Sequence, residues 1–242
     1  MIGILQTLDC PEIAEILSMS GFDWLFVDME HSALNVQSVQ RILQTIDGKC
    51  TGIVRVPSHD EMWTKQLLDA GARGIIFPQV NSAREAADII RGCKYPPEGS
   101  RGVGISRAQG YGLKFQDYVD TANREIAVIL QIEHIDGVRN IDSIVKVPGI
   151  DAIFVGPYDL SCSMNKIGRV NDPEVQQQIE TVRRACVDAG LTLGIFTANP
   201  REVKVFIEKG YRLIAVGIDI MLLGQSARQV LEMCESGESH EK

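Results

Sequence analysis

Two carboxylates that follow apolar runs of the sequence could together support metal chemistry. Glu133 ends the run 127–133 (AVILQIE), and Asp159 comes shortly after the run 152–155 (AIFV). Such nearly continuous apolar runs are typical of strands buried on both faces, where a terminal carboxylate must be solvated, paired or metal-bound. Two carboxylates at neighbouring strand ends could bind a hard divalent cation, with water or substrate oxygens completing an octahedron. Spacing alone leaves open the alternative of a helix-capping aspartate and a solvated glutamate.

Three further polar residues lie at the ends of other apolar runs. Asp28 ends one such run, and His31 follows it by three residues. That spacing lets a carboxylate orient the histidine ring and select its tautomer, as a general base requires. Arg55 ends another run, where a guanidinium is costly unless it contacts an anion. The anion could be a substrate or a developing enolate, or else Glu30 or Asp28 in a structural pair. The other histidines are expected to have structural roles: His59, His134 and His240.

Two other kinds of chemistry are disfavoured by the sequence. No lysine ends an apolar run, and only Lys166, in the loop after the sixth run, could swing toward a site. A Schiff-base mechanism needs a desolvated lysine and is therefore not expected. No Gly-x-Gly-x-x-Gly motif opens a helix, so a nucleotide cofactor is not supported.

Eight short apolar runs alternate with helix-like segments from one end of the chain to the other. The expected strands cover residues 2–5, 24–28, 52–55, 74–77, 127–133, 152–155, 192–195 and 213–217. The expected helices begin near Pro11, Val36, Glu61, Ser82, Val138, Pro173, Pro200 and Ile220. Eight strand-then-helix units without a break in composition predict one α/β domain over residues 1–242, a (β/α)8 TIM barrel. In such a barrel the chemistry lies at the C-terminal ends of the strands.

One connection, about residues 94–124, is too long for an ordinary loop in a compact domain. Its turn-forming residues indicate fixed conformations rather than a floppy insertion. We expect this long loop either to cover an active site or to build a subunit contact.

Composition and charge exclude several classes of partner. The net charge of −8 and the pI near 5.1 argue against nucleic acid and against an anionic membrane. The six cysteines follow no framework spacing and are expected to be reduced thiols. No signal peptide precedes the first strand, and no apolar run approaches the roughly 18 residues of a membrane helix. We therefore expect a soluble, cytoplasmic protein.

Several segments together resemble the HpcH/HpaI aldolases, which are metal-dependent class II pyruvate aldolases. The matching segments, in chain order, are residues 22–32 (FDWLFVDMEHS), 69–72 (DAGA), 95–104 (YPPEGSRGVG), 131–133 (QIE) and 155–161 (VGPYDLS). The resemblance covers nearly the whole chain. It implies a barrel of the phosphoenolpyruvate/pyruvate type and a divalent metal, Mg²⁺, Mn²⁺ or Co²⁺. It also implies a homo-oligomer, a trimer or hexamer, in which the last helix is exchanged between subunits.

The resemblance also implies roles for individual residues. Glu133 and Asp159 match the metal ligands, Gln131 a residue of the shell around the metal, and Arg55 the arginine that faces the pyruvyl oxygen. His31 and Asp28 match the acid–base pair. Asp69 matches an aspartate that reaches a neighbouring subunit's histidine. Gly156, with the amides near Tyr158 and Asp159, matches the donors to the pyruvate carboxylate.

The sequence departs from the family pattern at a few positions. Tyr158 stands where the family usually has Ala or Ser beside the pyruvate carboxylate, which bears on the size of the substrate. His134 replaces a common Thr or Ser, and residues 77–79 (FPQ) replace a pattern of small residues and Met. The short N-terminal helix of the family does not precede the first strand. Every expected metal ligand and the expected base are nevertheless present.

The expected reaction is retro-aldol cleavage of a 4-hydroxy-2-oxo acid to pyruvate and an aldehyde, through a metal-stabilised pyruvate enolate. The substrate is thus a small-molecule 2-oxo acid. One alternative is an acyl-CoA carbon–carbon lyase of the citryl-CoA or malyl-CoA type, which predicts a basic patch for the nucleotide. The other is a non-catalytic assembly protein built on a degenerate barrel.

Overall fold

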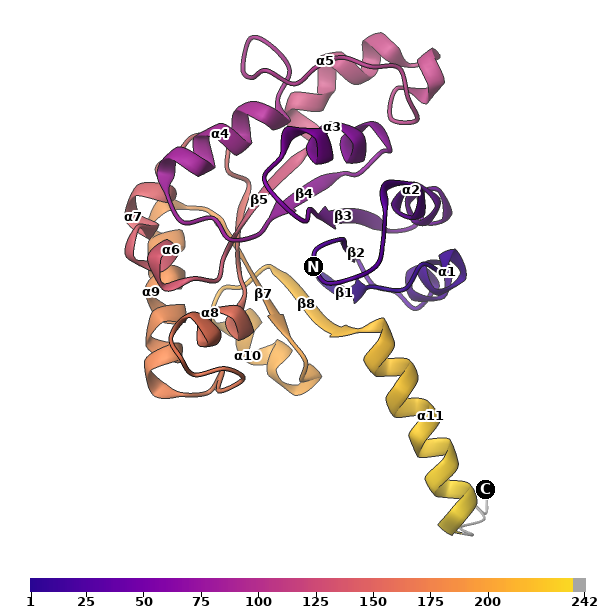
Figure 1. Cartoon of the computed structure of the whole chain (residues 1–242), viewed down its shortest axis with the longest axis vertical. Coiled ribbons are helices and arrows are strands. Elements are labelled where there is room, and N and C mark those ends of the chain that lie inside the picture. The colour runs from indigo at the N-terminus through magenta and orange to yellow at the C-terminus, as the bar shows by residue number, and fades with distance from the viewer. Residues whose placement is uncertain (237–242) are drawn as a thin grey trace.

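Eight parallel strands close into a barrel in chain order, each paired with the next and β8 paired with β1 (Figure 1). The structure is a computed structural model and describes residues 1–236. The strands are β1 (Ile2–Gln6), β2 (Trp24–Asp28), β3 (Thr51–Arg55), β4 (Gly74–Phe77), β5 (Ala127–Ile132), β6 (Ala152–Val155), β7 (Thr192–Thr197) and β8 (Leu213–Ile218). The predicted (β/α)8 barrel is confirmed: seven of its strands begin at the expected residue, and β3 begins one residue earlier than expected.

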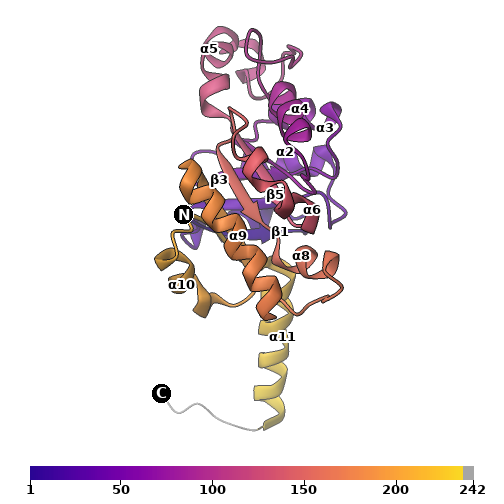
Figure 2. The ribbon, with the colours of Figure 1, turned by 90° about the vertical axis from the view of Figure 1, so that its left-hand side faces the viewer.

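Helices between the strands cover the outside of the barrel (Figures 1 and 2). They are α1 (Pro11–Met19), α2 (Val36–Thr45), α3 (Glu61–Asp69), α4 (Ala83–Cys93), α5 (Phe115–Glu125), α6 (Ile135–Arg139), α7 (Ile141–Ile144), α8 (Pro157–Ser163), α9 (Pro173–Ala189), α10 (Val203–Glu208) and α11 (Asp219–Ser236), with short 3-10 turns η1 (Gly110–Gly112) and η2 (Pro200–Glu202). None of these helices is both long and apolar enough to span a bilayer.

Side chains that alternate along the strands fill the barrel interior and set the site. Phe26, Ile53, Ile129 and Phe154 form one buried cluster inside the ring. Two residues further along three of these strands come Asp28, Arg55 and Gln131, which therefore point into the same interior at the C-terminal end.

The long connection is not one continuous loop. Its second half folds as η1 and α5, so the expected loop over residues 94–124 is wrong from residue 115 onward. It packs against the end of α3, where the Ala108 amide donates to the Asp69 carbonyl at 2.9 Å. No residue of this segment lines the cavity described below, so it does not cover the site of its own chain. The expected subunit contact stays a prediction.

The helix expected near Val138 begins earlier. His134 caps α6, and its Nδ1 accepts from the Asp136 amide at 3.1 Å. His59 has a structural contact too, with Nε2 at 2.5 Å from the Pro78 carbonyl. His240 lies outside the described residues.

The last helix, α11, projects from the barrel instead of packing along it (Figures 1 and 2). Asp219 anchors its first turn by accepting from the Thr7 and Leu8 amides at 2.9 and 3.0 Å. Beyond that anchor its apolar side chains are exposed, with Leu223 and Leu231 at 60% and 58%.

Candidate active site

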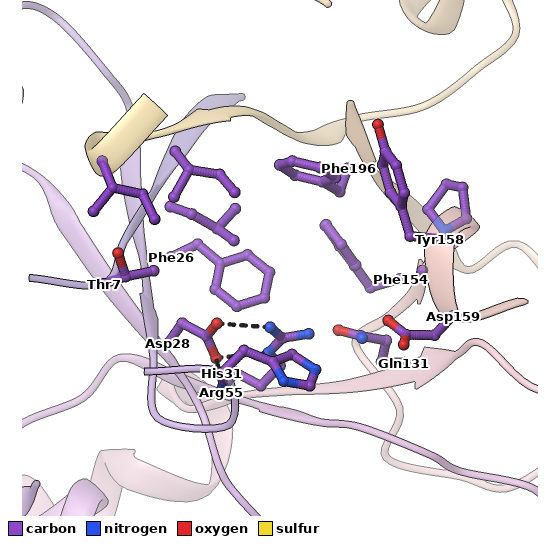
Figure 3. Close-up of a pocket in the computed structure, with 15 residues that line it drawn as sticks. Thr7, Phe26, Asp28, His31, Arg55, Gln131, Phe154, Tyr158, Asp159 and Phe196 are labelled. Carbon is purple, nitrogen blue, oxygen red and sulfur yellow. Dashed lines mark hydrogen bonds and ion pairs between the residues drawn. The ribbon is translucent and has the colours of Figure 1, made fainter. Parts of the chain in front are cut away.

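A cavity of about 210 Å³ lies at the C-terminal ends of the strands (Figure 3). Most of the residues that the sequence singled out line it, and they come from β2, β3, β5 and α8 and from the loops after β2 and β6. Its lining comprises Leu5, Thr7, Phe26, Asp28, His31, Arg55, Gln131, Phe154, Gly156, Pro157, Tyr158, Asp159, Phe196, Ile218 and Ile220. This is the end of the barrel at which catalysis was expected.

Arg55 is held in place by two carboxylates. Its register partner on the neighbouring strand is Asp28, which accepts from Arg55 Nε at 2.9 Å and from Nη2 at 2.7 Å. Glu30 Oε2 lies 3.1 Å from Arg55 Nη1. Burial alone would lower the pKa of Arg55, but its bonds to Asp28 and the charge of Glu30 raise it, so the guanidinium stays protonated. The structural pair is therefore present, and the guanidinium still lines the cavity.

The histidine ring has a different carboxylate beside it from the one expected. Asp28 is occupied by Arg55, and it accepts from the backbone amides of Glu30 and His31 at 3.0 and 3.4 Å rather than from the ring. The acid near the ring is Glu30, with Oε2 at 3.7 Å from His31 Nε2. The expectation that Asp28 orients the ring is wrong in this structure, because a buried guanidinium takes both of its carboxylate oxygens.

Glu30 lies beside Arg55 and His31, although the sequence had pointed to it only as a pairing candidate for Arg55. Burial raises its pKa to about 7, the Arg55 charge opposes that rise, and Asp28 and Asp159 add to it. Its Oε2 is buried and pairs with Arg55 by charge at 3.1 Å, without the geometry of a hydrogen bond. The signal was available, since Glu30 follows Asp28 by two residues and lies next to His31.

Glu133 lies one residue beyond β5 and is buried. Its Oε1 accepts from the Gln79 amide at 2.7 Å, and Gln131 Nε2 donates to its Oε2. Burial raises the pKa of Glu133 to about 7; these two hydrogen bonds oppose the rise, and Glu30 and Asp159 add to it. Gln79 has a left-handed backbone with φ of 55°, a conformation that costs free energy in a residue other than glycine and here serves the bond to Glu133.

Gly156 gives Glu133 the room it occupies. A Cβ at this position would lie 2.6 Å from Glu133 Oε2, so any other residue would displace the carboxylate. The Gly156 amide donates to the Ile132 carbonyl at 3.2 Å, so it is not free for the substrate carboxylate as expected. The amides of Tyr158 and Asp159 remain candidates, because amides in the first turn of a helix have no intrahelical acceptor.

Asp69 does not join this group. It ends α3, near the start of β4, and its Oδ1 accepts from Arg101 Nη2 at 2.8 Å. Arg101 is fully buried between the rings of Tyr95 and Tyr118, with its Cζ at 4.5 and 5.6 Å from their centroids. Any catalytic role of Asp69 therefore requires a second copy of the chain.

Residues 2–226 match the sequence profile of the HpcH/HpaI aldolase/citrate lyase family. The chain belongs to this family. It is 38% identical to a hydroxypyruvate/pyruvate aldolase of Paraburkholderia phytofirmans over 98% of this chain and 94% of the relative. It is 39% identical to a 4-hydroxy-2-oxo-heptane-1,7-dioate aldolase of Shigella sonnei over 93% of this chain and 87% of the relative. The crystal structure of an HpcH/HpaI family protein from Burkholderia cenocepacia superposes with a TM-score of 0.93 at 35% identity, covering 97% of this chain and 94% of that one.

HpcH/HpaI aldolases generally depend on a divalent metal ion. The cavity of this family member fits such an ion on charge. Asp28, Glu30 and Glu133 act on the charge of one cation, Arg55, and Asp159 acts on Glu30 and Glu133; the pKa values of Glu30 and Glu133 are raised to about 7. Within residues 1–236 no cluster of three or more Asp, Glu, His or Cys side chains is arranged as a metal site. A metal here would have fewer than three such side chains from one chain as ligands, and oxygens of water or substrate as the others.

Proposed function

We propose that this protein is a carbon–carbon lyase that cleaves a 4-hydroxy-2-oxo acid to pyruvate and an aldehyde with a divalent metal ion. The observation that carries the proposal is the convergence of buried Glu133 with Asp159, Arg55 and His31 in and around one cavity. Its aldolase relatives, 35–40% identical over most of the chain, support the same reaction class.

Glu133 and Asp159 would hold the metal, which when bound polarises the 2-oxo group and draws electron density from the breaking bond. Gln131 and the Gln79 amide fix the Glu133 carboxylate by hydrogen bonds. These bonds favour the ionised form, and burial disfavours it. A bound cation would offset that cost and keep both carboxylates deprotonated.

Arg55 would face the carbonyl oxygen of the pyruvyl half. Its Nε and Nη2 are committed to Asp28, which leaves Nη1, near Glu30, as the donor closest to the free space. A guanidinium fixed in advance stabilises negative charge as it develops on that oxygen, at no cost of reorganisation during the reaction.

His31 would accept the proton of the C4 hydroxyl group. Its ring lines the cavity and is 59% exposed, so it can exchange that proton with solvent. Loss of the proton breaks the C3–C4 bond; the aldehyde leaves, and the electron pair stays on the pyruvyl half. Protonation at C3 then gives pyruvate.

The test is release of pyruvate from a series of 4-hydroxy-2-oxo acids, with and without a chelator. We expect turnover that the chelator abolishes and added Mn²⁺ restores. His31→Asn should lower kcat by about 10²–10⁴-fold, the usual contribution of a positioned base. The matched control is His134→Asn, at a histidine that caps a helix outside the cavity. Turnover that is unchanged by the chelator, or a His31 variant with wild-type kcat, would contradict the proposal.

The acyl-CoA alternative is not favoured by the cavity. Of the Lys and Arg residues in the described part of the chain, Arg55 alone lines it, and two carboxylates already hold that group. A coenzyme A nucleotide carries several phosphate charges that would need basic partners.

We also propose that the protein is a cytoplasmic homo-oligomer assembled through α11. The apolar side chains of this projecting helix, Ile220, Leu222, Leu223, Val230 and Leu231, are 44–60% exposed in one chain. A row of that kind is typical of a surface covered by another subunit. An exchanged helix would also bring copies close enough for Asp69 to approach a neighbouring site.

Light scattering of the purified protein should accordingly give a mass of three or six chains. Leu223→Glu combined with Leu231→Glu should yield monomers, because the charges would be buried unpaired. The matched control is Gln229→Glu, which adds charge at a polar position of the same helix. A monomeric wild-type protein would contradict the assembly.

A further inference from the structure

The cavity has two chemically different sides. Arg55, Asp28, Gln131 and Asp159 lie together on one side in Figure 3. Across from them lie the rings of Tyr158 and Phe196. Leu5, Ile218 and Ile220 add aliphatic side chains to the lining of the cavity. A substrate bound to the polar residues by its 2-oxo acid end must therefore place its other end against an apolar surface.

Tyr158 and Phe196 form the outer part of this surface. Tyr158 is in the first turn of α8, and Phe196 is near the end of β7. Their ring centroids are 6.0 Å apart with the planes tilted by 55°, a spacing at which aromatic rings interact favourably. The Tyr158 side chain is 43% exposed although it is large and mostly apolar. A bound apolar group would remove that ring surface from water, which favours binding in proportion to the area covered.

The same side of the cavity offers no Lys or Arg to a second carboxylate. Its polar side-chain groups are the hydroxyls of Tyr158 and Thr7, and Thr7 is already bound: its hydroxyl donates to Asp219 Oδ1 at 2.7 Å and its amide to Oδ2 at 2.9 Å. The one Lys or Arg in the lining, Arg55, is held by Asp28 and Glu30. A carboxylate placed there would be desolvated without a cationic partner and repelled by the acids of the site.

We propose that Tyr158 and Phe196 bind the aldehyde half of the substrate and select 4-hydroxy-2-oxo acids with an uncharged apolar group at C4. Aryl and branched-alkyl groups meet this requirement, and a chain that ends in a carboxylate does not. The inference rests on the proposed lyase function and narrows its substrate class. It sets this chain apart from a relative named for a heptane-1,7-dioate substrate.

The experiment compares kcat/KM for pyruvate release from three compounds, with Mn²⁺ present. They are 4-hydroxy-2-oxo-4-phenylbutanoate, 4-hydroxy-2-oxoheptanedioate and the small reference compound 4-hydroxy-2-oxopentanoate. We expect the phenyl compound to exceed the dicarboxylate by at least about tenfold, which is the discrimination that 1.4 kcal/mol gives. Replacing the phenyl group by isobutyl distinguishes ring stacking from simple apolar contact, and either preference over the dicarboxylate supports the inference.

Tyr158→Ala should reduce the phenyl-to-dicarboxylate ratio by about 10-fold or more, and Tyr158→Phe should retain it, because the ring and not the hydroxyl makes the surface. Tyr111→Ala is the matched control, because Tyr111 is an exposed tyrosine that does not line the cavity. This variant should leave the ratio unchanged. The inference would be overturned if the wild type preferred the dicarboxylate, or if Tyr158→Ala lowered kcat/KM equally for all three compounds. Pyruvate from none of the compounds would instead overturn the lyase function on which it rests.

Discussion

Replacing Arg55 by lysine is expected to lower kcat/KM for pyruvate release by about 10²–10³-fold, the usual loss when one fixed donor to a developing oxyanion is removed. Lysine keeps the positive charge but cannot reproduce the two parallel bonds to Asp28, at 2.9 and 2.7 Å, that aim the guanidinium. Alanine would be less informative, since it leaves Asp28 buried without a cationic partner and destabilises the fold.

Arg41→Lys is the matched control for this prediction. Arg41 also binds an aspartate through both carboxylate oxygens, Asp9 at 3.1 Å, but on the surface and away from the cavity. It should keep wild-type kinetics. Circular dichroism and the melting temperature should show both variants folded, so that a wild-type rate in Arg55→Lys would remove Arg55 from the reaction.

Replacing Glu133 by glutamine should abolish measurable cleavage and yet make the metal-free protein more stable at alkaline pH. The kinetic loss follows from removing one of two carboxylate ligands. The gain in stability follows from burial, which raises the pKa of Glu133 from 4.5 to about 7. Glutamine fills the same space without carrying a charge, and its amide oxygen can still accept from Gln79.

The direction of the pH effect follows from the proton that the folded protein keeps. Between about pH 4.5 and 7 folded Glu133 binds a proton that the unfolded chain has already lost, so stability falls as the pH rises through this window. At about 1.36 kcal/mol per pKa unit the loss is on the order of 3 kcal/mol and is complete above pH 7. Glu30, with its pKa also near 7, lowers the stability with rising pH in the same direction in the wild type and in Glu133→Gln.

Melting temperatures in chelator at pH 5 and pH 8 measure this difference. The wild type should lose several degrees more than Glu133→Gln between the two pH values, at roughly 2–4 °C per kcal/mol for a chain of this size. Glu98→Gln, at an exposed carboxylate, should behave as the wild type. Parallel pH profiles for wild type and Glu133→Gln would show that Glu133 ionises normally in the folded state.

Much of the barrel could be predicted from the sequence, because its local signals agree with the global fold. Apolar runs of four to seven residues mark strands buried on both faces. Pro11 and Pro173 open helices, and Gly71, Gly190 and Gly210 adopt the left-handed backbone, with φ of 101°, 70° and 96°, that follows a helix end. Since parallel strands of a barrel expose their C-terminal ends together, Glu133, Asp28 and Arg55 could be assigned to one site.

Contacts between distant segments could not be predicted in the same way. Asp28 binds Arg55 rather than the His31 ring. This pairing depends on the register of β2 against β3 and on the lengths of the Asp28 and Arg55 side chains. The bond from Gln79 to Glu133 joins residues 54 positions apart and needs a backbone conformation unusual for glutamine. The projection of α11 has no local signature either. An amphipathic helix has the same sequence pattern whether its apolar face covers its own barrel or that of a neighbouring subunit.

The most direct test of the account is calorimetric binding of Mn²⁺ to the metal-free protein at pH 8, where Glu30 and Glu133 are ionised for most of the time. We expect one ion per chain, lost in Glu133→Gln and in Asp159→Asn, and kept in Asp136→Asn, which removes an exposed carboxylate outside the cavity. Equal binding by the wild type and the Glu133 and Asp159 variants, or no binding by the wild type, would contradict a metal held by these two carboxylates.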